Sequence, residues 1–182
     1  FVDLNDSVTY AELLARAQSI GSALSKTGTK NKPIAVYFDK CVNTISAMLG
    51  VVYSGNFYVV IDSEMPPARI NKIFGALSPV AVITDKKHHE NALQLEFSGD
   101  IYDLEEALSC KINSEKLAQI RSRQIDTDPL YALFTSGSTG VPKGAVVSHK
   151  SVMAYSEWVS NTFDITSETV FANQTPFYFS MS

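Results

Sequence analysis

The chain has 182 residues, of which 45% are hydrophobic and 19% charged, and its formal net charge is −4 at pH 7. Acidic and basic residues are interspersed, without the basic stripe typical of proteins that bind nucleic acids or membrane surfaces, so we expect neither partner. No apolar stretch reaches the roughly 18–20 residues that a membrane-spanning helix needs. The N-terminus carries no signal-peptide pattern, which favours a cytoplasmic protein.

The first half of the chain predicts helices and strands in alternation. Thr9 and Glu12 have the spacing of a capping box, and apolar residues at helical spacing follow until Gly28, which suits a helix end. Apolar runs predict strands at 33–38, 57–61 and 80–84, and helical patterns predict helices at 44–53 and 68–77. This alternation favours an α/β fold with mainly parallel sheets flanked by helices.

The second half is more polar before it returns to strand-like runs. We expect short helices at 104–108 and 115–121, strands at 130–134 and 145–147, and a helix over about 150–161 capped by Ser148. Residues 168–173 are expected to lead into a final strand. Because turn-forming residues cluster at 126–129, we expect a first α/β subdomain over residues 1–128 and the start of a phosphate-loop subdomain over 129–182.

Residues 134–144 read Phe-Thr-Ser-Gly-Ser-Thr-Gly-Val-Pro-Lys-Gly and are the most informative stretch. Glycines let a backbone approach a ligand, successive N–H groups form an anion-binding concavity, and hydroxyl and lysine side chains add donors and charge. The stretch follows a predicted strand, at the end where α/β sheets bind ligands. The residues that we assign to nucleotide phosphates are Thr135, Ser136, Gly137, Ser138, Thr139, Gly140, Lys143 and Gly144.

Two better-known phosphate loops do not fit this stretch. A Walker A loop has Gly-Lys followed by Ser or Thr, whereas Lys143 is followed by Gly144. A dinucleotide fingerprint opens a helix, whereas residues 145–147 are strand-like. A flexible linker of glycine and serine explains neither Pro142 and Lys143 nor the apolar runs on both sides.

Other polar residues give weaker signals. His88 and His89 are adjacent in a polar loop without an acidic or cysteine partner at ligand spacing, and we expect no metal site. His149 lacks a serine nucleophile and an orienting acid at plausible positions, so a general-base role is not expected. Asp62 ends a predicted strand and is read as a turn residue rather than a catalytic acid. The two cysteines are expected to be reduced, and we assign no catalytic residue within this chain.

The stretch at 134–144 resembles the phosphate-binding loop of the adenylate-forming enzymes, which include acyl-CoA synthetases, luciferases and amino-acid adenylation domains. The family pattern is an aromatic residue followed by Thr-Ser-Gly-Ser/Thr-Thr-Gly-x-Pro-Lys-Gly, and this chain matches it throughout. Segments 9–13, 50–62, 66–70 and 148–152 resemble further family landmarks in order and rough spacing. Residues 171–177 are most similar to the D-alanine–carrier protein ligase branch.

The resemblance covers residues 1–182 and implies the N-terminal part of an AMP-binding domain, with the C-terminal domain absent. It implies a ligase that uses ATP and Mg²⁺ to convert a small carboxylic or amino acid into an acyl-adenylate and pyrophosphate. The acyl group then passes to the thiol of a phosphopantetheinyl carrier protein. Because the family's other motifs lie beyond Ser182, we expect this fragment alone to be inactive. The alternative is a stand-alone nucleotide- or phosphate-binding module without catalysis.

The resemblance also assigns Phe179 and Ser180 to the substrate pocket. Amino-acid-activating members usually have Phe-Asp-x-Ser here, and their aspartate pairs with the α-ammonium of the substrate, whereas this chain has Phe-Ser-Met-Ser. A buried ammonium without its partner costs about 3–5 kcal/mol. We therefore expect a substrate without that ammonium, or a compensating acid elsewhere. The alternative is that Ser180 is a neutral wall residue of a pocket with other specificity.

Overall fold

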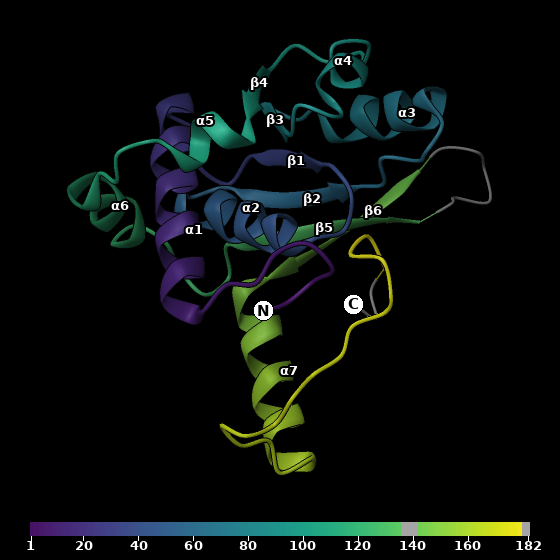
Figure 1. Ribbon diagram of the computed structural model, residues 1–182. Helices are drawn as coiled ribbons and strands as arrows, with labels where there is room; N and C mark the ends of the chain where they lie inside the picture. The colour runs from purple at the N-terminus through teal and green to yellow at the C-terminus, as the bar shows by residue number, and fades with distance from the viewer. Residues whose placement is uncertain (136–141, 180–182) are drawn as a thin grey trace.

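The computed structural model describes residues 1–135 and 142–179, which form a twisted sheet with helices on both faces (Figure 1). The elements, in chain order, are α1 (Tyr10–Leu24), the 3₁₀ turn η1 (Ser25–Thr27), β1 (Pro33–Tyr37), α2 (Val42–Tyr53), β2 (Phe57–Ile61), α3 (Pro67–Leu77), β3 (Ala81–Thr84), α4 (His89–Ala92), β4 (Asp100–Asp103), α5 (Leu104–Leu108), α6 (Ser114–Arg121), β5 (Pro129–Thr135), β6 (Lys143–Ser148) and α7 (His149–Thr162).

The described residues contain one six-stranded sheet, with the strand order β4-β3-β1-β2-β5-β6. The first five strands in this order run parallel, and β6 pairs antiparallel with β5. The predicted α/β class with a mainly parallel sheet is confirmed. Because β5 and β6 extend the sheet that the first strands build, both sides of residue 128 share a sheet, and the division into subdomains stays a prediction.

The side chains of β1 explain why its sequence is a continuous apolar run. Successive residues of a strand point to opposite faces of a sheet. Ile34 and Val36 pack in a buried cluster with α1, α2 and α5, whereas Ala35 and Tyr37 pack in a second cluster with α3 and α4. All five residues of β1 are buried, so both faces of the central sheet are covered.

Two glycines allow α1 and α2 to approach closely. A Cβ atom on Gly50 of α2 would lie 2.4 Å from Cγ2 of Ile20, and one on Gly21 of α1 would lie 2.5 Å from Cβ of Tyr53. Both distances are far below van der Waals contact. Larger residues at these two positions would therefore push the helices apart.

The predicted helix starts are confirmed. The Thr9 hydroxyl accepts a hydrogen bond from the Glu12 N–H, and the Glu12 carboxylate accepts one from the Thr9 N–H, which completes the capping box of α1. Gly28 has a φ of 66° in the left-handed region, where it ends the turn after α1. Ser148 caps α7 by accepting a hydrogen bond from the Ser151 N–H.

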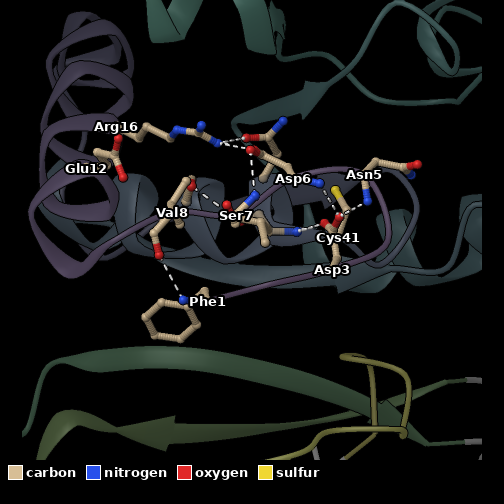
Figure 2. A network of polar contacts seen from close by, with 12 residues as sticks. Phe1, Asp3, Asn5, Asp6, Ser7, Val8, Glu12, Arg16 and Cys41 are labelled. Carbon is tan, nitrogen blue, oxygen red and sulfur yellow. Dashed lines mark hydrogen bonds and ion pairs between the residues drawn. The ribbon is translucent and has the colours of Figure 1, made fainter.

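A polar network joins the N-terminal turn to α1 and α2 (Figure 2). The Asp3 carboxylate accepts a hydrogen bond from the Val42 N–H at the start of α2, with an O···N distance of 2.7 Å. Arg16 of α1 donates both to Asp6, at 2.7 Å, and to Asn43 of α2, at 2.8 Å. Backbone hydrogen bonds, chiefly from Val42, lower the pKa of Asp3, and the hydrogen bond from Arg16 lowers the pKa of Asp6.

The second half departs from the expectations in two places. Strand β4 and the short helix α4 lie in the polar region for which no strand was predicted. The expected final strand after 168–173 is wrong, because residues 163–179 form turns and irregular backbone. No neighbouring strand among the described residues pairs with them, and Val170 and Phe171 are exposed. Within 1–135 and 142–179, no helix combines the length and apolarity that crossing a membrane requires.

Candidate functional site

The candidate site lies at the sheet edge where the parallel strands have their carboxyl ends. Strands β1, β2, β3 and β5 all end at this edge because they run in the same direction (Figure 1). Asp39 and Lys40 follow β1, Asp62 follows β2, and Asp85 follows β3. The glycine-rich stretch begins at the carboxyl end of β5, and ligands of α/β sheets bind at this edge.

The two ends of the glycine-rich stretch are held by the hairpin of β5 and β6. Thr135 pairs with Lys143, and Phe134 pairs with Gly144. The assigned residues Ser136, Gly137, Ser138, Thr139 and Gly140 lie outside the described residues. The Lys143 side chain is exposed and makes no hydrogen bond or ion pair with residues 1–135 or 142–179.

Gly144 has a packing reason to be glycine. A Cβ atom at this position would lie 3.0 Å from Cζ of Phe134, the residue opposite it in the hairpin. The aromatic ring therefore covers the glycine across the two strands. Its assigned role in phosphate binding stays a prediction.

A cavity of about 520 Å³ lies beside the end of β5. Its wall includes Leu133 and Phe134 of β5, Val59 of β2, and Tyr178 and Phe179 of the C-terminal segment. Phe179, which sequence analysis assigns to the substrate pocket, thus lies on a cavity wall next to the strand that leads into the glycine-rich stretch. Ser180, assigned to the same pocket, is outside the described part of the chain.

A charged cluster around Asp39 occupies the same edge. Asp39 accepts hydrogen bonds from Lys87 and Ser63, and its Oδ1 lies 3.3 Å from Nε2 of His88. The hydrogen bond from Lys87 is the largest cause of the lowered pKa of Asp39, and the hydrogen bond from Ser63 is the second largest. The hydrogen bond between Lys87 and Asp39 also raises the pKa of Lys87. The cluster ties the loops after β1, β2 and β3 together.

The expectation that His88 is a loop residue without an acidic partner is wrong. His88 is 4% exposed, and its Nδ1 lies 2.6 Å from Oδ1 of Asp85. The spacing of these two residues, three apart in sequence, is the signal that could have revealed the contact. Residues 1–135 and 142–179 contain no group of three or more His, Cys, Asp or Glu side chains arranged to hold a metal ion.

The remaining polar residues considered in the sequence analysis make contacts that support the fold. Asp62 forms a turn, since its carboxylate accepts a hydrogen bond from the Glu64 N–H and its carbonyl one from the Met65 N–H. His149 is the first residue of α7, and its N–H donates to the Asp128 carbonyl. Cys41 and Cys110 are both free thiols.

The AMP-binding enzyme family matches residues 1–182, and the chain belongs to this family. A D-alanine–D-alanyl carrier protein ligase of Listeria welshimeri is 31% identical over 189 residues, which cover 96% of this chain and 34% of the ligase. Tyrocidine synthase 3 of Brevibacillus parabrevis is 30% identical over 177 residues, which cover 97% of this chain and 3% of the synthase. The chain therefore spans about a third of the ligase and a small part of the synthase.

Solved structures of adenylate-forming enzymes share the fold. A crystal structure of the nonribosomal peptide synthetase FmoA3 has a TM-score of 0.82 at 22% identity, and the match covers 96% of this chain and 18% of that one. A form of the same protein with AMPPNP bound has a TM-score of 0.79 at 21% identity, over 96% of this chain and 18% of that one.

Proposed function

We propose that this chain belongs to a ligase that activates a small carboxylic or amino acid with ATP and transfers the acyl group to a carrier-protein thiol. The carboxylate attacks the α-phosphorus of ATP, which forms an acyl-adenylate and releases pyrophosphate. The phosphopantetheine thiol then attacks the acyl carbon and releases AMP. D-alanine–D-alanyl carrier protein ligases, about 31% identical, support this assignment.

One observation carries the proposal. The stretch 135–144, rich in glycine and hydroxyl residues, begins at the carboxyl end of β5 and ends on β6, and the ladder pair Thr135–Lys143 closes it. Backbone N–H groups, hydroxyls and an ammonium are the groups that bind phosphate oxygens. Lys143, exposed and without a partner among the described residues, supplies the charge that favours the β- and γ-phosphates.

The residues at this edge fit ATP better than they fit a metal held by protein alone. Mg²⁺ usually keeps several waters and is bound through one or two carboxylates together with substrate phosphates. We therefore propose that Mg²⁺ enters with ATP, and we assign none of the described residues as its ligand. What this chain contributes is a fixed position for the phosphates and a wall for the acyl group.

Lys143→Ala tests the phosphate assignment in the full-length protein. Because a hydrogen bond to a charged group is worth about 1.5–3 kcal/mol, we expect kcat/KM for ATP to fall about 10- to 150-fold in carboxylate-dependent ATP–pyrophosphate exchange. Thr139→Val, which removes a hydroxyl donor at similar volume, should also weaken ATP use. Lys150→Ala, in the first turn of α7 just after β6, is the control and should keep wild-type kinetics. Unchanged ATP kinetics in Lys143→Ala and Thr139→Val would contradict the assignment.

The acid that is activated is tested at Ser180. A serine cannot neutralise an α-ammonium, so we propose a substrate without a free α-amino group, or a compensating acid in the pocket. Ser180→Asp should improve the use of alanine relative to its deaminated analogue by about 5- to 150-fold, since close charge pairs couple by about 1–3 kcal/mol. Efficient use of D- or L-alanine by the wild type, with no other carboxylate near the ammonium, would argue against this and favour a D-alanine ligase.

We further propose that residues 1–182 alone do not catalyse the reaction, because they span only about a third of the related ligases. The isolated chain should show no carboxylate-dependent ATP–pyrophosphate exchange. Robust exchange by the isolated chain would refute this part of the proposal. Nucleotide binding without exchange in the full-length protein would instead support a binding module without catalysis.

A further inference from the structure

Lys40 joins two parts of the chain that are far apart in sequence. Its Nζ lies 2.6 Å from the Asn173 carbonyl oxygen, 2.7 Å from Oδ1 of Asn173 and 2.9 Å from the Thr175 carbonyl oxygen. An ammonium has three N–H donors, so these three acceptors match its capacity. The same Nζ lies 5.1 Å from the centre of the Phe177 ring, within the range of a cation–π contact.

A second contact holds the same segment at the end of the next strand. Tyr178 donates a hydrogen bond to the Asp62 carboxylate, which follows β2, and this hydrogen bond raises the pKa of Tyr178. Phe177 and Tyr178 also pack against the buried cluster beneath α1 and α2. The C-terminal segment, drawn in yellow in Figure 1, thus turns back from α7 to the sheet and contacts the ends of β1 and β2.

These contacts hold residues that lie immediately before Phe179. Residues 163–179 form no strand, so no backbone ladder fixes them to the sheet. Phe179 nevertheless lies on the wall of the 520 Å³ cavity with Leu133 and Phe134, immediately after the residues that Lys40 and Asp62 hold. The side chains of Lys40 and Asp62 therefore join this segment to the ends of β1 and β2 without strand pairing.

We propose that Lys40 is a positioning residue that holds residues 173–179 against the sheet edge so that Phe179 forms one wall of the acyl pocket. Asp62 does the same through Tyr178. The inference rests on the proposed function, since it takes the cavity beside β5 as the place of the carboxylic acid. Lys40 is not among the residues that line this cavity, so its loss should act indirectly, on the acid rather than on ATP.

The test compares Lys40→Met with Lys86→Met in the full-length protein. Methionine keeps much of the length of lysine but removes the donors and the charge. Lys86 is the matched control, because it follows β3 at the same edge, its side chain is 77% exposed, and it contacts Glu105 rather than the C-terminal segment. Lys40→Arg, which keeps a charge and several donors, is the conservative variant that should restore part of the effect.

Two measurements are made on each variant. Amide hydrogen exchange of residues 170–179 reports whether the segment is held, and we expect Lys40→Met to exchange about tenfold faster, as the loss of about 1.4 kcal/mol implies. Steady-state kinetics of ATP–pyrophosphate exchange report whether the acyl pocket keeps its shape. We expect KM for the carboxylic acid to rise about tenfold while KM for ATP changes less than about twofold. Lys86→Met should match the wild type in both.

Each outcome decides the inference. Unchanged hydrogen exchange in Lys40→Met would overturn the contact, and faster exchange with an unchanged KM for the acid would overturn the positioning role. If Lys40→Met does not fold, Tyr178→Phe removes only the hydroxyl that contacts Asp62 and should shift both measurements in the same direction by a smaller factor. An inactive wild type would refute the proposed function and with it the positioning role, whereas hydrogen exchange would still show whether Lys40 holds the segment.

Discussion

The centre of the sheet and the hairpin that carries the glycine-rich stretch differ in burial although they share one sheet. All five residues of β1 are buried, whereas β6 has four exposed residues and α7 has no buried residue. Met153, Tyr155, Trp158 and Phe163 are large side chains that α7 and its end leave exposed. The stability of the described fold therefore depends mainly on the central layers, whereas the proposed site lies where substitutions disturb few contacts.

The largest expected difference in the free energy of unfolding is between truncation of a large apolar side chain in the central layers and a similar truncation in α7. Leu24 of α1 is 0% exposed, and Leu24→Ala should lower the free energy of unfolding by about 2–5 kcal/mol because it leaves a cavity in a packed core. Met153 of α7 is 67% exposed, and Met153→Ala should change the free energy by less than about 0.5 kcal/mol. Urea unfolding measures the free energy of both variants. Equal losses would show that the central layers do not contribute more to stability than α7 does.

Two glycines of the central layers should respond in opposite ways to an added methyl group, because only one of them lies at a close helix contact. Gly50→Ala should cost about 1–3 kcal/mol, because the added methyl group meets Ile20 at the α1–α2 contact. A methyl group added at Gly75 of α3 would enter open space, with no atom beyond its own helix within 4 Å. Gly75→Ala should therefore stabilise the protein by about 0.5–1 kcal/mol through helix propensity. Thermal unfolding distinguishes the two signs: a gain in Gly50→Ala would contradict the close helix contact, and a loss in Gly75→Ala would contradict the open space at α3.

Asp128 links the two regions by hydrogen bonds. It precedes β5 and accepts hydrogen bonds from the Ile125 N–H, at 3.0 Å, and from Nδ2 of Asn31 before β1, at 2.8 Å, while Nζ of Lys30 lies 3.2 Å away. Asp128→Asn replaces an acceptor oxygen by a donor group, and we expect a loss of about 1–2 kcal/mol in urea unfolding at neutral pH. Asp100→Asn, at an exposed position of β4, is the matched control.

The pH dependence of stability gives a second measure of this link. Burial alone would raise the pKa of Asp128, but hydrogen bonds from Ile125, Asn31 and Lys30 outweigh it and lower the pKa. A carboxylate whose pKa is lowered by folding stabilises the protein above its unfolded pKa of about 4, and this contribution is lost as pH falls toward the folded value. The wild type should therefore lose stability more steeply than Asp128→Asn as pH falls below about 4. Parallel pH profiles would contradict this.

The smallest effect on stability is expected at the proposed site itself. Lys143 is exposed, and its side chain makes no hydrogen bond or ion pair with the described residues. Lys143→Ala should therefore change the free energy of unfolding by less than about 0.5 kcal/mol, although it weakens ATP use. Thermal unfolding of the variant checks this, and a large loss would mean that the lysine has a structural role.

Local sequence patterns predicted most of the fold because local physics determines those elements. The capping box at Thr9 and Glu12 marked the start of α1, and the apolar run at 57–61 matched β2 at both ends. Strand β4 was missed because Asp100 and Asp103 stand at its ends and none of its residues is fully buried. The final strand was predicted wrongly because strand formation requires a pairing partner, which a local apolar pattern does not reveal.

The candidate site was predictable only in part, for a related reason. The composition of the glycine-rich stretch favours phosphate binding, and the strand before it ends at the sheet edge where ligands of α/β sheets bind. Lys40 gives no such signal, since it contacts residues more than 130 positions away, and a lysine after a strand is usually solvated. His88 was misread only partly for this reason: Asp39 reaches it from the loop after β1, whereas Asp85, three residues away in sequence, could have been recognised as a partner.

The ladder pair of Thr135 and Lys143 has a consequence for how the chain tolerates insertions. In polymer terms, the pair fixes the two ends of residues 136–142, and the entropy of closing a loop changes slowly with contour length. Doubling the number of residues adds only about 0.6 kcal/mol to the closure free energy. The closure entropy of the pair therefore places little restriction on how many residues separate Thr135 from Lys143.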